Sequence, residues 1–424
     1  MKEKSNRRPK IAFFDYADVF EDFYPHYGVT QETFATTWHN TGSHVWLKII
    51  QDKIGDVTWY ELSLKPAIKE SQNHYVDCKV KFVSSSFLHR KMWKFFYLGP
   101  FAAKSWKYYK AFGTLASYLS IASCQLIQTL IKDKPDVFLV QDYGSGKFDM
   151  LILLSKIFRK PLLTIHTGSR PEEYLGRFFR PYTLRKASWI CPSGQNELKM
   201  LNKNYKVSLS KLSVLRPPVN TDVYKPLLRE EACKRTGLDE TKRYWIFVGR
   251  LDDGMKRVSA IIEAFSKLSD EYPNIDLLIM GSGKDEENLK KQATGNILGR
   301  VHFIGWIDTE EKKAWYYNVA ECLLLASKRE GFPTVIGEAF ACNIPVISSD
   351  VGTISDLVVH GKTGWLFPAY DDKAMLICFR DAASNPGKIA EKKLSLRSIA
   401  MNEVSFAAVS DALEAAFHTV LNKK

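Results

Sequence analysis

Two glutamates eight residues apart are the strongest candidates for chemistry in this sequence. Glu330 and Glu338 begin and end the segment EGFPTVIGE, which follows a short apolar run and opens a predicted helix. Their carboxylates could accept hydrogen bonds from the hydroxyls of a hexose and a ribose that flank a diphosphate. The alternative is that both are charges on the solvated face of a helix end. The apolar run before the segment and the GFP turn within it favour a binding site.

The turn between the two glutamates suits a phosphate. Gly331 permits close approach of the backbone, Phe332 follows it, and Pro333 fits the first helical turn because it has no N–H to leave unpaired. The amides of Thr334 and Val335 then lie at the positive end of the helix, where an anion is stabilised. We therefore expect this turn to contact a phosphate-bearing ligand.

A second polar cluster follows another apolar run. The segment FVGRLDDGMKR (247–257) places Arg250 and Lys256 after a predicted buried strand, where open parallel sheets bind ligands. A guanidinium and an ammonium both pair with a diphosphate and would stabilise its charge as it leaves. The alternative is an exposed basic loop. Asp252 and Asp253 could mimic a metal motif, but we interpret them as loop solvation and expect no metal.

Two further segments are weaker candidates. His166 ends the apolar run in TIHTG and could hydrogen-bond a sugar hydroxyl, although a lone histidine at a strand end is more often structural. The segment GSGKDEE (281–287) resembles a nucleotide-binding loop. A tight turn from strand to helix explains its glycines equally well.

Short apolar runs along the chain predict the strands that position these residues. They alternate with helix-length segments, which indicates parallel sheets built from βαβ units. The segment HYGVTQETFATTWHNTGSHV (26–45) is expected to form a glycine turn, a helix and a second strand from about Val45. The predicted strands are KIAFFD (10–15), VFLVQD (137–142), PLLTIHTG (161–168), SWICPS (188–193), YWIFVGR (244–250), IDLLIMGSG (275–283), VHFIGW (301–306), ECLLLAS (321–327) and IPVISSD (344–350).

The length of 424 residues suits two domains. Three prolines in LRPPVNTDVYKP (215–226) mark the linker between them. The expected domains are residues 1–215 and 216–390. The residues from 391 to 424 have a helical pattern and are expected to pack back toward the first domain.

Charge and cysteine content narrow the class of protein. The net charge of +13 and pI of about 9.2 favour partners with anionic surfaces, although solubility alone is the alternative. Seven scattered cysteines without a CxxC pair indicate a reducing compartment rather than a disulfide framework or a structural zinc site. The sequence shows no signal-peptide pattern, and no apolar run reaches the ~18 residues that span a bilayer.

One basic and aromatic stretch could contact a membrane. Between Asp77 and Asp133 there are nine lysines or arginines and no acidic residue. At its centre, residues 89–112 interleave lysines with tryptophan, phenylalanine and tyrosine, as an interfacial membrane surface requires. The alternatives are an ordinary helix or acceptor-cleft wall, and a surface that stacks single-stranded nucleic acid.

Taken together, these residues resemble glycosyltransferase family 4, a large retaining group with the two-domain GT-B fold. Glu330 and Glu338 fit that family's paired glutamates, and Arg250 and Lys256 fit its phosphate-binding pair. The resemblance implies that the first glutamate contacts the donor sugar, the second the ribose, and the two cations the diphosphate. His166 falls where the family keeps a histidine near the donor sugar.

The resemblance extends over most of the chain, with two departures. FYPHYGVTQETF (23–34) is similar to the family's N-terminal glycine loop, which implies that Gly28 contacts the donor. TGSHV (41–45) is similar to the strand entrance that follows, and residues 344–368 match the family pattern with glycines at the expected turns. The departures are Val29, where the family has the second of two glycines, and Arg257, where a glycine is common.

The fold that the resemblance implies is α/β of the GT-B class, with two Rossmann-like doubly wound domains facing a central cleft. The first domain would bind the acceptor and the second a UDP- or GDP-sugar. The implied activity is metal-independent, retaining transfer of a hexose to a hydroxyl of a glycan, a lipid-linked or another acceptor, with no cofactor and no nucleic acid. We expect a cytoplasmic enzyme, peripheral on the inner face of an anionic membrane through residues 89–112.

Three other classes of protein remain as alternatives. The first is a sugar-nucleotide epimerase or a phosphorylase on the same architecture. The second is a non-catalytic protein that binds sugar nucleotides, and the third is a nucleic-acid-binding protein.

Overall fold

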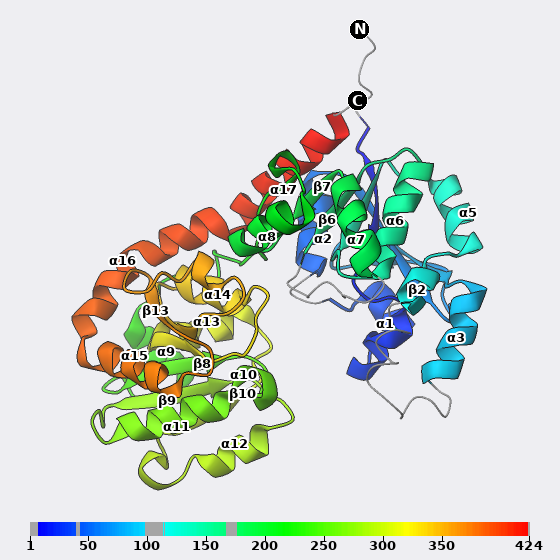
Figure 1. Ribbon diagram of the computed structural model, residues 1–424. Coiled ribbons are helices and arrows are strands. Elements are labelled where there is room, and N and C mark those ends of the chain that lie inside the picture. Colours follow the sequence, from blue (N-terminus) through cyan, green and yellow to red (C-terminus); the bar gives the residue numbers. More distant parts are fainter. Residues whose placement is uncertain (1–6, 40–42, 98–112, 114, 167–175, 423–424) are drawn as a thin grey trace. The chain divides into compact units, whose positions relative to one another are not determined.

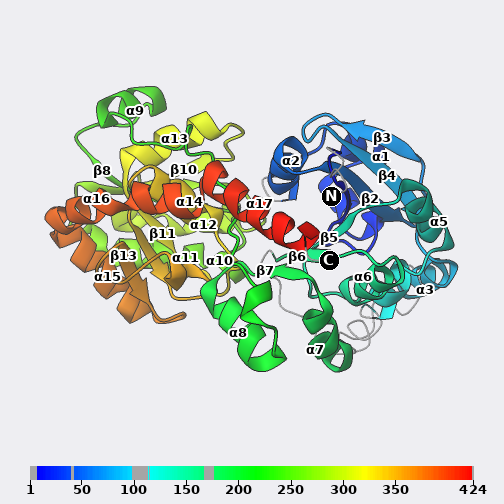
Figure 2. The same ribbon diagram turned by 90° about the horizontal axis from the view of Figure 1, so that it is seen from above.

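The chain divides into two compact units, each with one central sheet flanked by helices (Figures 1 and 2). The first unit comprises residues 1–215 and 410–424, and the second residues 216–409. The computed structural model describes residues 7–39, 43–97, 113, 115–166 and 176–422.

Among the described residues of the first unit, seven strands form one sheet, in the order β3-β4-β2-β1-β5-β6-β7. All neighbours pair in parallel except β3, which is antiparallel to β4. The strands are β1 (Lys10–Phe14), β2 (Asp56–Ser63), β3 (Glu70–Asn73), β4 (Cys78–Ser84), β5 (Val137–Gln141), β6 (Leu162–Ile165) and β7 (Trp189–Cys191). β5 is buried at every residue, as expected for a strand covered on both faces. The strands predicted at β1, β5, β6 and β7 are confirmed.

The helices of the first unit include one that the sequence analysis predicted wrongly. Val45 does not start a strand but lies in α2. The buried residues Trp46, Ile49 and Ile50 recur three and four residues apart, which places them on one helical face. The helices are α1 (Gln31–Thr36), α2 (Ser43–Lys53), α3 (Phe87–Tyr97), α5 (Cys124–Asp133), α6 (Gly146–Ile157), α7 (Gly176–Lys186) and α8 (Gln195–Tyr205), with short 3₁₀ helices η1 (Phe20–Asp22), η2 (Tyr24–Tyr27) and η3 (Leu209–Lys211).

Six parallel strands form the sheet of the second unit, in the order β10-β9-β8-β11-β12-β13. They are β8 (Arg243–Val248), β9 (Ile275–Met280), β10 (Val301–Gly305), β11 (Ala320–Leu325), β12 (Val346–Ser349) and β13 (Gly364–Phe367). The chain first adds β9 and β10 on one side of β8. It then crosses to the other side of β8 and adds β11, β12 and β13, so the strand order reverses between β8 and β11. The five strands predicted here, β8 to β12, are confirmed.

The second unit includes residues past 390, because α16 contributes Leu396 and Ala400 to its core. Residues 391–422 are largely helical, as the sequence predicted. The helices are α9 (Arg229–Thr236), α10 (Asp253–Lys256), α11 (Val258–Ser269), α12 (Glu286–Gln292), α13 (Glu310–Val319), α14 (Thr334–Ala341), α15 (Asp372–Ser384) and α16 (Pro386–Glu403), with 3₁₀ helices η4 (Gly295–Ile297) and η5 (Ile354–Asp356). Most of α17 (Phe406–Asn422) belongs to the first unit, which includes residues 410–424.

The predicted membrane-contact stretch 89–112 is described only in part. Residues 89–97 belong to α3, and residues 98–112 lie outside the described part of the chain. None of the helices that the structure describes is long and apolar enough to cross a membrane.

Candidate active site

The reversal of strand order places two loops side by side at the carboxyl edge of the second unit's sheet. β8 pairs with β9 on one side and with β11 on the other. Open parallel sheets bind ligands at such a point. The loop after β8 carries Arg250 and Lys256, and the loop after β11 carries Glu330. A hydrogen bond of 2.9 Å from the Lys328 amide to the Met255 carbonyl joins the two loops.

Lys256 and Glu330 form the centre of this site. Lys256 Nζ donates to Glu330 Oε1 at 2.5 Å, although 74 residues separate them. Their side chains are 20% and 10% exposed, so the pair is mostly but not fully covered. The structure therefore brings together two residues that the sequence singled out in separate motifs.

Arg250 supplies a second cation from the same loop as Lys256. Its side chain is exposed, and within the described part of the chain no ion pair or hydrogen bond holds its guanidinium. An unpaired guanidinium at a strand-order reversal is available to an anionic ligand.

Helix α14 begins one residue later than the sequence suggested. Pro333 is buried at the N-cap with an extended backbone, rather than in the first helical turn. Thr334 and Val335 start the helix and are partly exposed. The first amides of a helix have no earlier helical carbonyl within reach, so these two amides are left for an external acceptor.

The loop that carries Glu330 is fixed by the loop after β12. Gly352, at φ +64°, lies so close that a Cβ there would come 2.0 Å from the Glu330 carbonyl oxygen. Thr353 Oγ1 donates a 2.6 Å hydrogen bond to the Gly331 carbonyl. Because both contacts are to backbone, they hold the glutamate and the start of α14 in one arrangement. Phe332, between these positions, is partly exposed and packs against the core of the unit.

Glu338 lies in the second turn of α14 and is partly engaged. Its Oε2 accepts a 2.8 Å hydrogen bond from the buried Tyr317 hydroxyl. Burial raises the pKa of Glu338, and the hydrogen bond from Tyr317 only partly offsets this. Its other oxygen has no hydrogen-bond partner among the described residues.

The glycine between these features, Gly337, was not singled out from the sequence. A Cβ there would lie 2.9 Å from Val219 Cγ2 and 3.1 Å from Val404 Cγ2. Gly337 therefore lets α14 pack closely against the segments before α9 and after α16. The sequence carried a signal, since a glycine inside a short apolar helix usually marks close packing.

Arg257 occupies a backbone position that favours glycine. It ends α10 at φ 52°, in the left-handed region, which costs an ordinary residue about 1 kcal/mol. Its guanidinium pairs with Asp372 at 2.7 Å and lies 5.4 Å from the centre of the Tyr370 ring. The turn therefore keeps a glycine-type conformation although the residue is arginine.

The weaker loop candidates have structural roles. Asp253 accepts hydrogen bonds of 2.8 and 2.7 Å from the amide and hydroxyl of Ser259, so it holds the start of α11, and the interpretation of it as loop solvation was wrong. Asp252 pairs with Lys284 at 3.3 Å. Among the residues that the structure describes, no group of three His, Cys, Asp or Glu side chains is arranged to hold a metal ion.

The glycines of the GSGKDEE segment allow two loops to touch. A Cβ on Gly281, at φ +136°, would lie 1.9 Å from the Gly249 carbonyl oxygen, and one on Gly283 would lie 2.4 Å from that of Leu251. Backbone contact between the loops after β8 and β9 therefore accounts for this pair.

His166 lies in the first unit, at the carboxyl end of β6, and is buried. Its Nδ1 contacts Glu197 Oε1, and its Nε2 lies 3.5 Å from Asp142 Oδ1. The ring stacks on Tyr143 with 4.4 Å between ring centres. Burial alone would raise the pKa of Glu197, but hydrogen bonds from His166, Tyr143 and Ser193 outweigh it and hold the pKa below its usual value.

Glu197 was missed from the sequence. It lies in the first turn of α8, four residues after Ser193. Its carboxylate accepts hydrogen bonds of 2.9 and 3.0 Å from the amide and the hydroxyl of Ser193. An acidic residue in the first turn of a helix is a typical helix-start signal, which could have drawn attention to it.

Gly28 ends η2 in the first unit, at φ 71°. A Cβ there would meet nothing within 4 Å, so its conformation rather than space favours glycine. The neighbouring Val29, the departure from a glycine pair, is 7% exposed and turned into the protein.

Comparison with known proteins finds a family match in the second unit. Residues 229–396 match the model of the family described as glycosyl transferases group 1. The second unit is similar to this family over those residues. The match covers β8 to β13 and therefore the whole candidate site of the second unit.

Two curated proteins are similar to part of this chain. The chain is 30% identical to D-inositol 3-phosphate glycosyltransferase of Streptomyces avermitilis over 230 residues. The aligned part covers 52% of this chain and 49% of the relative. The chain is 32% identical over 130 residues to phosphatidyl-myo-inositol mannosyltransferase of Mycobacterium leprae, 31% of this chain and 34% of that protein. The chain spans about half or less of the length of the curated relatives it matches.

A solved structure resembles the chain along most of its length. The crystal structure of Anabaena Alr3699/HepE in complex with UDP matches with a TM-score of 0.67 at 16% identity, over 97% of this chain and 100% of that one. The fold is GT-B, with two Rossmann-like α/β units, as the sequence predicted.

Proposed function

We propose that the chain is a retaining hexosyltransferase that uses a UDP- or GDP-sugar and needs no metal ion. The observation that carries this proposal is the Lys256–Glu330 pair beside the start of α14, at the strand-order reversal of the second unit. A cation, a carboxylate and two helix-start amides are a matched set for a diphosphate and the sugar attached to it.

In this proposal, the diphosphate binds Arg250, Lys256 and the amides of Thr334 and Val335. Its arrival draws Lys256 from Glu330, because both compete for the same ammonium. Glu330 is then free to accept hydrogen bonds from the hexose. The cost of leaving its charge partly covered is offset by those new donors.

The ribose in this proposal binds at Glu338. Tyr317 occupies one carboxylate oxygen and orients the group, while the other oxygen can accept from a ribose hydroxyl. Such a contact exists before and during the reaction. It therefore contributes to binding of the donor rather than to the chemical step.

The proposed reaction forms a bond between the acceptor oxygen and the anomeric carbon, on the face from which the diphosphate leaves. The bond from that carbon to the diphosphate oxygen breaks, and the acceptor proton passes to the leaving diphosphate. Arg250 and Lys256 stabilise the charge that develops there, which is the task a divalent ion would otherwise perform.

The acceptor in this proposal is a hydroxyl of a glycan or a lipid-linked molecule, bound by the first unit. The names of two relatives refer to inositol 3-phosphate and phosphatidyl-myo-inositol, which supports a polyol with a phosphate. We further propose a cytoplasmic enzyme, peripheral on an anionic membrane through residues 89–112. His166, held by Glu197, and Gly28 are the first unit's proposed contributors to sugar binding.

A panel of donors tests this proposal. UDP- and GDP-hexoses are first compared by thermal shift, because a ligand of the native state raises its stability. The best donor is then incubated with polyol and glycolipid acceptors in EDTA, and the anomeric proton of the product is followed by NMR. We expect the donor's anomeric configuration in the product; an inverted product, or no stabilisation by any nucleotide-sugar, would refute the proposal.

A further inference from the structure

Helices α7 and α8 carry a one-sided charge on the first unit. They pack together, and Arg185 of α7 donates to the Tyr205 carbonyl of α8 at 3.3 Å. Residues 176–211 contain one acidic residue, Glu197, and eight lysines or arginines, of which Arg180 is buried and paired with Asp149. Glu197 is engaged by His166, Tyr143 and Ser193, so it does not neutralise the outer surface.

The outer surface of α7 combines exposed rings with cations. Phe178 is 67% exposed and Tyr182 is 58% exposed, four residues apart on one helical stripe. The Arg177 guanidinium lies 4.7 Å from the centre of the Phe178 ring, and Lys186 Nζ lies 5.2 Å from that of Tyr182. Exposed apolar side chains that lie together, rather than singly, mark an interaction site.

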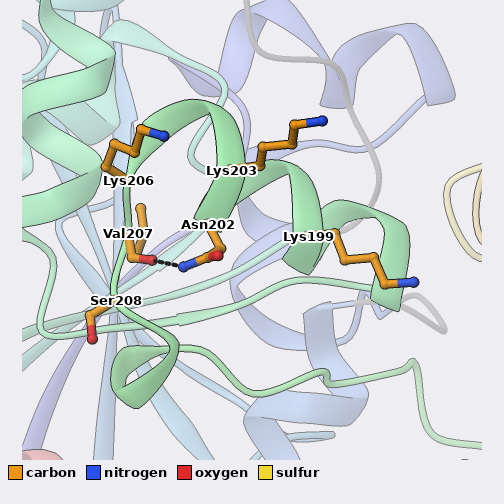
Figure 3. A pocket seen from close by; sticks show the side chains of 6 residues that line it. All are labelled: Lys199, Asn202, Lys203, Lys206, Val207 and Ser208. Atoms are coloured by element: carbon orange, nitrogen blue, oxygen red, sulfur yellow. Dashed lines mark hydrogen bonds between the residues drawn. The ribbon is translucent and has the colours of Figure 1, made fainter.

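The outer surface of α8 adds a stripe of lysines. Lys199, Lys203 and Lys206 follow each other at spacings of four and three residues along the helix. With Asn202, Val207 and Ser208 they line a surface pocket of about 700 Å³ (Figure 3). Within the described part of the chain none of the three lysines forms an ion pair. The pocket is large enough for a phosphate headgroup, and its charge suits one.

We propose that this α7–α8 face docks the protein on an anionic lipid bilayer. Phe178 and Tyr182 would sit at the boundary of headgroups and acyl chains, and the α8 lysines would contact headgroup phosphates. Each ring has a cation on one face only, so a nucleic-acid base is the competing ligand, and an oligonucleotide competitor in the vesicle assay distinguishes the two. The same cations suit a bilayer surface, where rings insert by their edges while the charges stay in water.

This surface is built from other residues than 89–112 and does not rest on the proposed donor site. Its contribution is large enough to measure. Each cation near an anionic surface is worth about fivefold in binding. Losing two lysines should therefore lower vesicle binding by about 25-fold, and reversing their charge by more.

The experiment is co-sedimentation of the full chain with vesicles of phosphatidylcholine, with and without phosphatidylglycerol. The test variants are Lys199→Glu/Lys203→Glu and Phe178→Ser/Tyr182→Ser. Lys362→Glu/Lys373→Glu is the matched control, because it makes the same change in net charge at two exposed lysines of the second unit. Circular dichroism and thermal unfolding check that each variant is folded.

We expect wild type and the control to bind anionic vesicles alike and the lysine variant to lose at least 25-fold. The aromatic variant should bind only at low salt, because at 1 M the Debye length falls to about 3 Å and only inserted rings resist it. Three results would overturn the proposal. They are a wild type that ignores anionic vesicles or prefers an oligonucleotide, a control that loses as much as the lysine variant, and loss confined to a Lys91→Glu/Lys94→Glu variant of α3.

Discussion

Removing the Lys256 ammonium tests the site where two motifs meet. In Lys256→Ala, the leaving diphosphate loses one of its cations, which should lower kcat by about 10²–10³, or about 2.7–4 kcal/mol of transition-state stabilisation. The free protein should also be affected. The Glu330 carboxylate, 10% exposed and 2.5 Å from Lys256 Nζ, is left unpaired at a cost of about 1–3 kcal/mol. That corresponds to about 2–4 °C in Tm for each kcal/mol.

The two effects separate in a second variant. Glu330→Gln keeps an oxygen that can accept from Lys256 but removes the charge, so activity should fall while Tm changes little. Glu330→Ala should lose most transfer and stay folded. The assay is steady-state turnover with a confirmed donor, together with calorimetry, and Lys362→Ala is the control because that lysine is exposed and lies outside the site. Turnover of Lys256→Ala or Glu330→Ala within about threefold of wild type would refute the site, since the expected loss is ~10²-fold or more.

Three further predictions concern the donor, the metal and pH. Glu338→Ala should raise KM for the donor and leave kcat unchanged, because a ribose contact is equally strong in the ground state and the transition state. A large fall in kcat at constant KM, measured by steady-state kinetics, would contradict this role. Transfer should be complete in excess EDTA, and activity lost to the chelator and restored by manganese or magnesium would show that the cations do not suffice. Burial, with smaller contributions from Arg90 and Lys147, lowers the pKa of His89 to about 4, below its value near 6.5 in the unfolded chain. The folded state therefore binds the proton less readily than the unfolded state. The stability of the fold is full above pH 6.5 and falls as the pH falls toward 4. At pH 5 this effect should lower the free energy of unfolding by about 2 kcal/mol. The free energy of unfolding of His89→Gln, measured with urea, should therefore depend less steeply on pH than that of wild type. The same pH dependence in both proteins would contradict this role of His89.

Much of the fold followed from uninterrupted apolar runs. β5 and β9 are buried at every residue, and such runs are easy to recognise as central parallel strands. β2, β3 and β4 were not predicted. β2 has a buried glutamate, Glu61, within it, and β3 is short and polar, so neither offers an apolar run. The strand predicted at Val45 was wrong because five apolar residues close together fit either a strand or one face of a helix.

The site could be predicted in its parts but not in its pairings. Glu330, Lys256 and the start of α14 each followed an apolar run, so their place at the carboxyl edge of a sheet was predictable. The contact of Lys256 with Glu330 depends on which strands are neighbours, and a separation of 74 positions hides this in the sequence. Gly337 and Glu197 act through packing and hydrogen bonds of distant segments, which a local pattern does not reveal.

The central claim is that the second unit holds a sugar diphosphate between its two loops. A crystal structure of the chain with its best UDP- or GDP-hexose measures this directly. We predict diphosphate oxygens within hydrogen-bond distance of Lys256 Nζ, the Arg250 guanidinium and the Thr334 and Val335 amides, with the hexose on Glu330. A diphosphate bound elsewhere, with the Lys256–Glu330 pair still closed, would contradict the account.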